Sequence, residues 1–271
     1  MKLEEFLTDN KTKLGEIKYP IKKIKTTQDY VMVFLEEDKI MIPIESYFKY
    51  DLKNIKGLDD NLLNIFKEEE KILKAYRSCL RKLAVKDNTV KQIKDYLYKK
   101  ELTTAEVNKI IDKLIEYNLL NDEKYCINKL NQYENSNTSY KQIKTKLSKD
   151  GISDELIERY VINNSDKEYT KALHLADKYA KSLRNKSLRA KKQSIINKLV
   201  NLGFTLETSK NALDETEIDS DNELELLSKE YDKALKKYAK KYSDYELRQK
   251  IYASLLSKGF NTEDIKKILE V

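Results

Sequence analysis

Apolar residues recur along most of this 271-residue chain with the spacing of one helical face. Residues 142–161 read QIKTKLSKDGISDELIERYV, in which Ile143 and Leu147 lie one helical turn apart and so share a face. Gly151 stands where a helix that ends in a left-handed residue favours Gly, and Ser153 begins an acidic stretch typical of a helix start. The segment therefore predicts a helix, a sharp turn and a second helix.

This pattern of Ile, Leu, Gly and an apolar residue occurs in four places. The Ile residues are at positions 93, 143, 195 and 251, which gives spacings of 50, 52 and 56 residues (143 − 93, 195 − 143, 251 − 195). Such spacings are in the range of helical repeat units. Gly203 and Gly259 fill the Gly position in the last two copies, whereas the first copy has Glu101 there. Because Glu is less favourable than Gly in a left-handed turn, we expect the turn at Glu101 to differ locally.

A long amphipathic helix is predicted in front of the helix pair. In the last two copies its apolar face is formed by Tyr169, Ala172, Leu173, Ala176, Tyr179 and Leu183, and by Leu224, Leu227, Tyr231, Ala234, Leu235 and Tyr238. Capping boxes, in which Ser or Thr precedes Glu by three residues, predict helix starts. The pairs with this spacing are Thr103 with Glu106, Ser165 with Glu168, and Ser220 with Glu223. Each copy is therefore predicted to be a unit of three helices.

The N-terminal part of the chain follows another pattern. Residues 30–35 alternate, a polar turn follows, and an apolar stretch resumes at residues 40–44, which predicts a strand, a turn and a strand. A lone hairpin is marginally stable, so we expect a third strand near residues 19–24 or a helix packed on it. Residues 51–58 are expected to form a short helix and a Gly turn, after which Asp59 caps the next helix.

The predicted fold is mainly α, with four tandem three-helix repeats in an elongated, curved array and a small N-terminal β-containing module. The expected boundaries are residues 1–65 for the β-hairpin module, and 66–120, 121–164, 165–216 and 217–271 for repeats 1 to 4. No apolar run of about 18 residues and no signal-peptide pattern occurs, so we expect a soluble, cytoplasmic protein. We also expect it to be a monomer.

The sequence offers little chemistry. Cys79 and Cys126 stand at apolar helical positions without a CxxC partner, which favours buried structural thiols. His174 is the only His, which excludes multi-His metal and relay sites. No GxSxG, P-loop or GxGxxG motif occurs, so we expect no enzyme activity, no cofactor and no metal. A hydrolase would require a carboxylate cluster, and nothing in the sequence singles out such a pair.

Basic residues are unevenly distributed. Residues 1–70 hold 12 Lys and 15 Asp or Glu, which is a net charge of −3. Because the whole chain has a net charge of +7, residues 71–271 have a net charge of +10. Residues 167–198 contain ten basic and two acidic side chains, and KALKKYAKKY at residues 233–242 is a second basic stretch. The simplest interpretation is Lys on solvated helix faces. The alternative is a surface that binds nucleic acid or an acidic protein. The candidate contact residues are Lys178, Lys181, Arg184, Arg189, Lys192, Lys236, Lys237 and Lys240.

The order of these features resembles the RecX family of RecA regulators. The residues that carry the resemblance are 75–83 (AYRSCLRKL), the turn at 118–125 (NLLNDEKY) and the repeated Gly turns. In the turn at 118–125 we expect Leu119 and Leu120 to complete the core of the first repeat. We expect Asn121 or Asp122 to cap the following helix, and Tyr125 to begin the buried face of that helix. Short family members resemble three units, whereas this chain has a fourth unit and an N-terminal extension, as longer members have. Glu101 also departs from the family pattern, because it replaces the expected Gly.

The resemblance implies binding in the groove of the RecA filament on DNA, with inhibition of filament extension, ATP hydrolysis and strand exchange. It thus implies a role in homologous recombination, DNA repair and the SOS response. A second hypothesis is a helical protein that binds DNA directly, with some of the 19 Tyr residues as stacking platforms. Most of these Tyr residues fall on apolar helical faces, so core packing explains them more simply.

Overall fold

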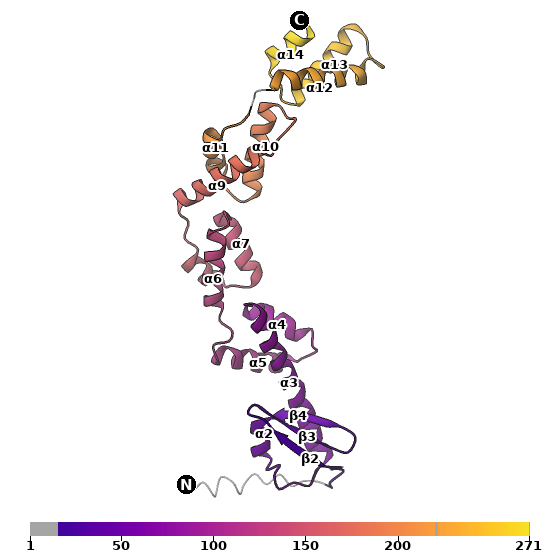
Figure 1. Ribbon diagram of the computed structural model, residues 1–271, viewed down its shortest axis with the longest axis vertical. Helices are drawn as coiled ribbons and strands as arrows, with labels where there is room; N and C mark the ends of the chain where they lie inside the picture. The colour runs from indigo at the N-terminus through magenta and orange to yellow at the C-terminus, as the bar shows by residue number, and fades with distance from the viewer. Residues whose placement is uncertain (1–15, 220–221, 271) are drawn as a thin grey trace. The chain divides into compact units, whose positions relative to one another are not determined.

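The structure is a computed structural model that describes residues 16–219 and 222–270 (Figure 1). It is mainly helical with a small N-terminal β-module, as predicted from the sequence. Two compact units are defined by internal contacts, Met1–Tyr125 and Cys126–Val271. The first holds the β-module and repeat 1, and the second holds most of repeat 2 with repeats 3 and 4. Each unit is described by itself.

A three-stranded antiparallel sheet forms the centre of the β-module. Its strands are β2 (Lys23–Thr26), β3 (Tyr30–Phe34) and β4 (Lys39–Pro43), in the order β2-β3-β4. Val31 pairs with Ile42 and Val33 with Ile40, and all four side chains are buried on one face. Because alternate residues of a strand point to the same side, the sequence alternation places this apolar face against the core. The predicted hairpin and its supporting third strand are confirmed.

The prediction of a helix at residues 51–58 is wrong. A short helix, α2 (Ile44–Lys49), lies before that segment and starts directly after Pro43, which suits the N-terminal edge of a helix. Gly57 instead belongs to β5 (Gly57–Leu58), which pairs with β1 (Tyr19–Pro20). A methyl group on Gly57 would lie 2.8 Å from the carbonyl oxygen of Tyr19, so the close pairing of these strands explains the glycine.

Helix α3 (Asp60–Val85) is shared by the β-module and repeat 1. Asp59 caps it as predicted, by accepting a hydrogen bond from the Leu62 amide at 2.7 Å. The first half packs Phe66 into the core of the module, and the second half packs Cys79 into the core of repeat 1. The expected module boundary at residue 65 therefore falls inside a continuous helix.

Repeat 1 is completed by α4 (Val90–Tyr98) and α5 (Thr104–Glu116). The predicted capping box of Thr103 and Glu106 is present, and the Thr103 amide donates to the Glu106 carboxylate at 2.7 Å. The expectation that the turn at Glu101 differs locally is confirmed in part. Glu101 has φ of 58°, and its amide donates to the Tyr98 carbonyl as the Gly203 amide donates to the Val200 carbonyl in repeat 3. The Phe204 amide also donates to the Leu199 carbonyl, and the described residues of repeat 1 show no corresponding bond from Leu102 to Leu97.

Repeat 2 consists of α6 (Asp122–Glu134), α7 (Tyr140–Asp150) and α8 (Asp154–Tyr160). The helix, turn and helix predicted around Gly151 are confirmed: this residue has φ of 94°, and the Ser153 hydroxyl accepts from the Leu156 amide. Ile143 and Leu147 are buried on one face of α7.

The turn that precedes α6 agrees only in part with the prediction from the sequence. Asn121 caps the helix by accepting from the Lys124 amide at 2.9 Å, and Leu120 and Tyr125 are buried as expected. Leu119, which was expected in the core, is 47% exposed. Only one of the two adjacent leucines can point toward the helix pair, and this residue is Leu120.

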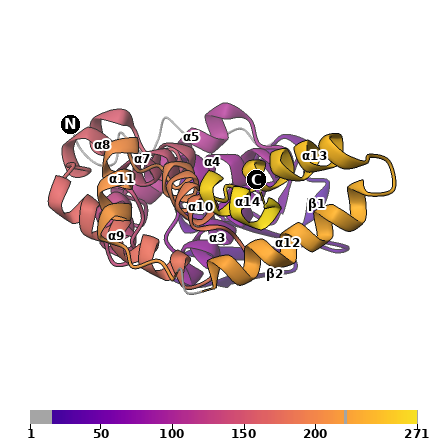
Figure 2. The same ribbon diagram turned by 90° about the horizontal axis from the view of Figure 1, so that it is seen from above.

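Repeat 3 consists of α9 (Ser165–Ala180), α10 (Leu188–Asn201) and α11 (Leu206–Glu215). Repeat 4 consists of α12 (Glu223–Tyr238), α13 (Asp244–Ser257) and α14 (Thr262–Leu269). Figure 2 shows α12 and α13 side by side, joined by the turn at residues 239–243. Each repeat has its own core. The buried residues of these cores are Ala172, Ala176, Ile195, Leu199, Phe204, Ala212 and Leu213 in repeat 3, and Leu227, Ala234, Ile251, Leu255, Phe260, Ile265 and Leu269 in repeat 4.

The predicted capping box of Ser165 and Glu168 is not formed, and the one predicted for Ser220 and Glu223 falls partly outside the described residues. Helix α9 is capped by Asn164, and Ser165 is already inside the helix. Ser220 lies outside the described residues. The carboxylates of Glu168 and Glu223 instead accept hydrogen bonds from backbone amides at the start of another repeat's second helix.

Candidate partner-binding surface

Five of the predicted contact residues lie at one end of the α9 and α10 pair. Lys178 is in the last turn of α9, Lys181 is the residue that ends this helix, and Arg184 is in the connection to α10. Arg189 and Lys192 lie in the first turns of α10. All five side chains are exposed. We call them the repeat 3 cluster.

The other three predicted residues lie at the C-terminal end of α12. Lys236 and Lys237 are in its last turn and Lys240 follows in the connection to α13. They too are exposed, and we call them the repeat 4 cluster. Positive charge at the C-terminal end of a helix interacts favourably with the helix dipole, which explains part of the sequence preference without any partner.

The residues of both clusters form no ion pair within residues 16–219 and 222–270. Other lysines of the same helix behave differently. Lys229 pairs with Glu225 at 2.6 Å, and Lys233 pairs with Glu230 at 2.6 Å. Helix α12 thus has a neutralised N-terminal part and a C-terminal part with uncompensated positive charge, as a surface for an anionic partner requires.

Aromatic rings extend the repeat 4 cluster. The ammonium group of Lys237 lies 5.0 Å from the Tyr238 ring centroid, and that of Lys250 lies 5.3 Å from the Tyr242 centroid. The two tyrosine centroids are 6.4 Å apart. The hydrogen bond with Lys237, and a second one with Ser254, lower the pKa of Tyr238. Cations over ring faces are favourable contacts, so the positive charge is held near a partly exposed aromatic pair.

Two cations of this surface were missed by the sequence analysis. Lys198 of α10 is exposed and its ammonium group lies 6.0 Å from the Tyr179 ring centroid, beside the residues that end α9. It is the last residue of the basic stretch 167–198, so its position was a usable signal. Lys250 lies on a helix that is not rich in Lys, and only the packing of α13 on α12 brings it to the cluster.

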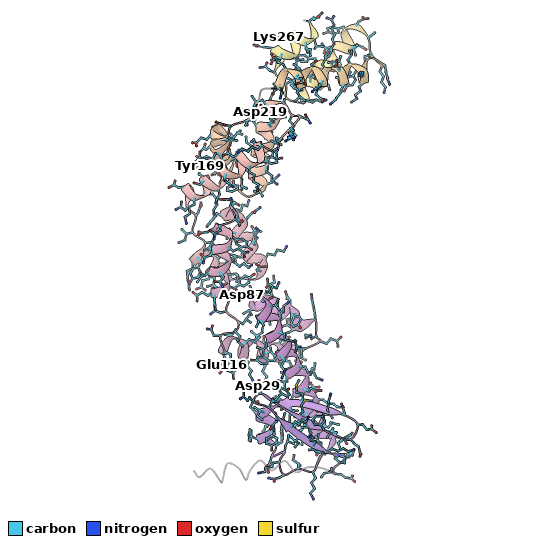
Figure 3. All side chains as sticks on the ribbon, viewed as in Figure 1. Asp29, Asp87, Glu116, Tyr169, Asp219 and Lys267 are labelled. Atoms are coloured by element: carbon cyan, nitrogen blue, oxygen red, sulfur yellow. The ribbon has the colours of Figure 1, made fainter. Side chains whose placement is uncertain are left out.

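A polar cleft of about 330 Å³ lies between the repeat 3 cluster and α12. Arg184, Lys186 and Lys191 line one side. The Lys191 ammonium group donates at 2.6 Å to the carbonyl oxygen of Asp219, a residue labelled in Figure 3. Glu223 lines the other side and already accepts from the Leu188 amide at 2.8 Å. The hydrogen-bond donors and acceptors that line this cleft therefore serve mainly to join repeats 3 and 4.

The two thiols are buried, as predicted. Cys79 and Cys126 are fully buried, and burial raises the pKa of the Cys79 thiol to about 11, so this thiol is a poor nucleophile. His174 is exposed on α9. In the described part of the chain no group of three or more His, Cys, Asp or Glu could hold a metal ion. The arrangement suits binding through charge and does not suit a nucleophilic reaction at these thiols.

Among the helices of residues 16–219 and 222–270, none is long and apolar enough to cross a lipid bilayer.

Comparison with known proteins identifies relatives that cover nearly the whole chain. The regulatory protein RecX of Streptococcus gordonii is 30% identical over 249 residues, which are 89% of this chain and 94% of the relative. RecX of Lactococcus lactis subsp. cremoris is 30% identical over 92% of this chain and 95% of the relative. RecX of Streptococcus uberis is 37% identical over 67% of this chain and 71% of the relative.

Two family patterns match the repeats themselves. Residues 75–114 match the first three-helix domain of RecX, and residues 221–269 match the third. The fold is also similar to a crystal structure of regulatory protein RecX, with a TM-score of 0.59 and 20% sequence identity over 73% of this chain and 100% of that chain. The residues that suggested the resemblance, the family patterns and the long relatives agree, and the chain belongs to the RecX family of regulatory proteins.

Proposed function

We propose that this chain binds the RecA filament on DNA and limits its extension, and thereby lowers ATP hydrolysis and strand exchange. The family to which the chain belongs supports a regulatory role, and the resemblance in the sequence implies RecA as the partner. The single observation that connects this role to the molecule is a set of eight exposed cations on repeats 3 and 4 that form no ion pair within the described residues.

The proposed action is binding alone, by a monomer in the cytoplasm and without cofactor or chemistry. Exposed charges contribute little individually, but several modest contacts on linked repeats add in free energy when the repeats engage the partner together. The two clusters lie on consecutive repeats of one unit, so they can act as two linked binding modules.

The experiment reverses charge in the repeat 3 cluster. The variant Lys178→Glu, Lys181→Glu, Lys192→Glu is titrated into a RecA ATPase assay on single-stranded DNA and compared with the unchanged protein. We expect inhibition to weaken by at least roughly tenfold in concentration, because favourable contacts become repulsive.

A matched control separates local contacts from net charge. Lys86, Lys99 and Lys109 are exposed lysines of repeat 1, and their replacement by Glu changes the total charge equally. This control should keep most of the inhibition. If the repeat 3 variant inhibits as well as the unchanged protein, the repeat 3 cluster does not contact the filament.

Direct binding of DNA is the second candidate function. The observation that favours it is the aromatic pair Tyr238 and Tyr242 with Lys237 and Lys250 beside the rings, since bases stack on aromatic side chains between cations. A steep fall in affinity for naked DNA between low and physiological salt would support phosphate contacts. Inhibition that appears only when the DNA is saturated with this protein would favour this mechanism over filament binding.

A further inference from the structure

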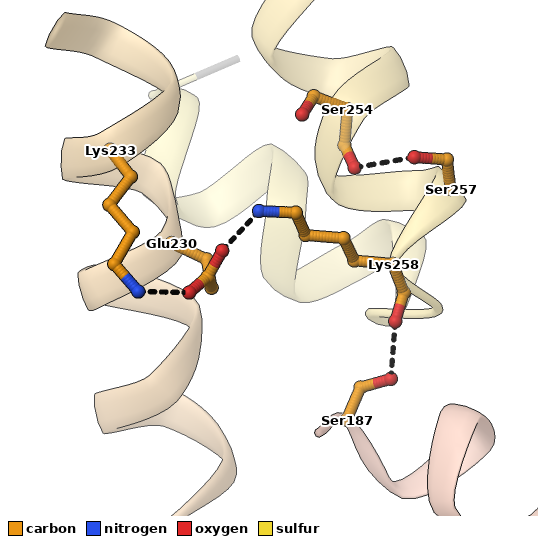
Figure 4. A network of polar contacts seen from close by, with 6 residues as sticks. All are labelled: Ser187, Glu230, Lys233, Ser254, Ser257 and Lys258. Atoms are coloured by element: carbon orange, nitrogen blue, oxygen red, sulfur yellow. Dashed lines mark hydrogen bonds and ion pairs between the residues drawn. The ribbon is translucent and has the colours of Figure 1, made fainter. Parts of the chain in front are cut away.

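One hydrogen bond recurs between successive repeats. In Figure 4 the hydroxyl of Ser187, which caps α10 in repeat 3, donates to the carbonyl oxygen of Lys258 in repeat 4 at 2.6 Å. The hydroxyl of Ser139, which caps α7 in repeat 2, donates to the carbonyl of Leu202 in repeat 3 at 2.5 Å. Each carbonyl belongs to the residue directly before the glycine of the repeated turn. The start of one repeat's second helix therefore meets the end of the next repeat's second helix.

The repeated glycine is required by this approach. A methyl group on Gly203 would lie 2.7 Å from Oγ of Ser139, and one on Gly259 would lie 2.9 Å from Oγ of Ser187. Both distances are shorter than side-chain carbons and hydroxyl oxygens tolerate, because packed interiors leave no space for an added methyl group. A side chain at either position would push the two repeats apart.

The left-handed conformation alone does not explain the glycine. Glu101 occupies the equivalent turn of repeat 1 with φ of 58° and makes the same backbone hydrogen bond as Gly203 and Gly259. Its side chain is exposed. A residue with a side chain therefore adopts a left-handed turn at this position where its side chain is exposed, and Gly203 and Gly259 mark the turns that another repeat's cap approaches.

A carboxylate completes the contact. Glu168 at the start of repeat 3 accepts a hydrogen bond from the amide of Tyr140, which follows Ser139, at 3.0 Å. Glu223 at the start of repeat 4 accepts from the amide of Leu188, which follows Ser187, at 2.8 Å. These are the two glutamates whose spacing predicted capping boxes. They satisfy free amides of a neighbouring repeat's helix and not of their own.

The same three parts thus form two joints. The first joint consists of Ser139, Gly203 and Glu168, and the second consists of Ser187, Gly259 and Glu223; both lie within one compact unit. The serine is almost fully buried in each case, with 1% exposure for Ser139 and 2% for Ser187. Buried and fully satisfied polar contacts of this kind favour one relative arrangement of the groups they connect.

The corresponding serine of repeat 4 forms no joint of this kind, and no further repeat follows it within the described residues. Ser243, which precedes α13, is exposed and its side chain makes no capping hydrogen bond. Asp244 beside it has φ of 47°. The serine is buried and bonded only where the next repeat supplies the glycine and the carboxylate, which ties the feature to the contact between repeats.

We propose that Ser187, Gly259 and Glu223 are positioning residues, which hold repeats 3 and 4 at a fixed step so that both basic clusters meet the filament together. This inference rests on the proposed function. Ser187 lies between Arg184 and Arg189 of the repeat 3 cluster, so the joint connects that cluster directly to repeat 4. Two linked contacts gain affinity only while their geometry allows simultaneous engagement, so a changed step weakens binding without removing any charge.

The test is a double-mutant cycle in the full-length protein with Gly259→Ala, Ser187→Ala and the pair combined. Nitroxide labels on Glu207→Cys in repeat 3 and Arg248→Cys in repeat 4, both exposed positions, report the distance between the repeats by electron spin resonance. The two native thiols are buried, so the labels attach at the introduced positions. Inhibition of the RecA ATPase is measured on the same variants.

We expect Gly259→Ala to shift or broaden the distance distribution and to raise the concentration for half inhibition by roughly tenfold or more. Removing the Ser187 hydroxyl in that background should recover part of both changes, because the added methyl group then has more room. Glu101→Ala is the matched control and should alter neither quantity, since it keeps a side chain in the same turn away from any such cap.

The failures are distinguishable. An unchanged distance distribution in Gly259→Ala, or no recovery on removing the Ser187 hydroxyl, overturns the joint. A changed distance with unchanged inhibition overturns its positioning role. If the unchanged protein does not inhibit RecA at all, the proposed function fails, and the distance measurement still decides whether the joint sets the step.

Discussion

The turns at Glu101 in repeat 1 and Gly259 in repeat 4 share a left-handed backbone and one backbone hydrogen bond, and they have different neighbours. Both residues have positive φ, 58° and 84°, and both close the end of a repeat's second helix. The side chain of Glu101 is exposed, whereas the Ser187 hydroxyl lies 2.9 Å from the place where a side chain of residue 259 would begin. A repeated glycine can therefore mark contact between repeats as well as a backbone conformation, and the two requirements can be separated by mutation.

The largest effect is expected from Gly203→Ala. The substitution adds the cost of a left-handed residue to a clash at 2.7 Å with Ser139, so we expect a loss of about 2–4 kcal/mol in the free energy of unfolding. Urea denaturation followed by circular dichroism measures it. The comparison with repeat 1 predicts that Glu101→Ala changes stability by less than about 1 kcal/mol, because both residues there carry a Cβ. Equal losses at the two positions would mean that backbone conformation alone explains the glycine.

A somewhat smaller loss is expected from Glu168→Ala. It leaves the Tyr140 amide without its carboxylate acceptor, which should cost about 1–3 kcal/mol. Glu155→Ala is a useful control, because Glu155 is exposed and pairs only with Arg159 four residues later on the same helix. The glutamate contact between repeats would be unimportant if these two variants had the same denaturation midpoint.

The pH dependence should distinguish Glu168 from Glu106, which caps its own helix. Hydrogen bonding from the Thr103 backbone lowers the pKa of Glu106, so its stabilisation is present at neutral pH and is lost as pH falls through that lowered pKa. Burial raises the pKa of Glu168, so its charge is unfavourable at neutral pH and the penalty is relieved as pH falls toward the ordinary glutamate range.

Glu106→Gln and Glu168→Gln, measured against the unchanged protein between neutral pH and about pH 3, below the ordinary glutamate pKa, test this difference. The loss of stability in Glu106→Gln, relative to the unchanged protein, should become smaller on acidification. Over the same pH range the unchanged protein should gain stability relative to Glu168→Gln. Parallel curves for the two variants would contradict the assignment of one glutamate to its own helix and the other to a joint.

The smallest effect is expected from Glu101→Gly. Glycine relieves the left-handed strain but increases the freedom of the unfolded chain, so the two changes offset each other and the net difference should stay within about 1 kcal/mol. Thermal unfolding can resolve this. A large stabilisation would show that the Glu101 turn carries more strain than its left-handed backbone conformation explains.

Much of this architecture could be predicted because it depends on local periodicity. The spacing of Ile143 and Leu147 is enough to place a buried helical face, and Gly151 with Ser153 is enough to end one helix and start another. The helix expected at residues 51–58 failed because a strand pairing with residues 19–20, distant in sequence, determines that segment.

The contacts between repeats were not predictable for the same reason. Ser139 and Leu202 are 63 residues apart, so no local pattern connects them. Glu168 and Glu223 each follow a serine with capping-box spacing, which suggested that they cap their own helices. Their carboxylates instead accept hydrogen bonds from backbone amides of the neighbouring repeat. The eight basic residues could be named because exposed lysine runs are visible in sequence, whereas Lys250 joins them only through packing.

The most direct measurement of the central claim is the rate of DNA-dependent ATP hydrolysis by the cognate RecA, with this protein titrated from far below to near stoichiometric amounts. A protein that blocks filament extension should inhibit at substoichiometric amounts, because one bound molecule stops the addition of many RecA subunits. Inhibition that begins only when this protein saturates the DNA, or no inhibition at any amount, would contradict the account.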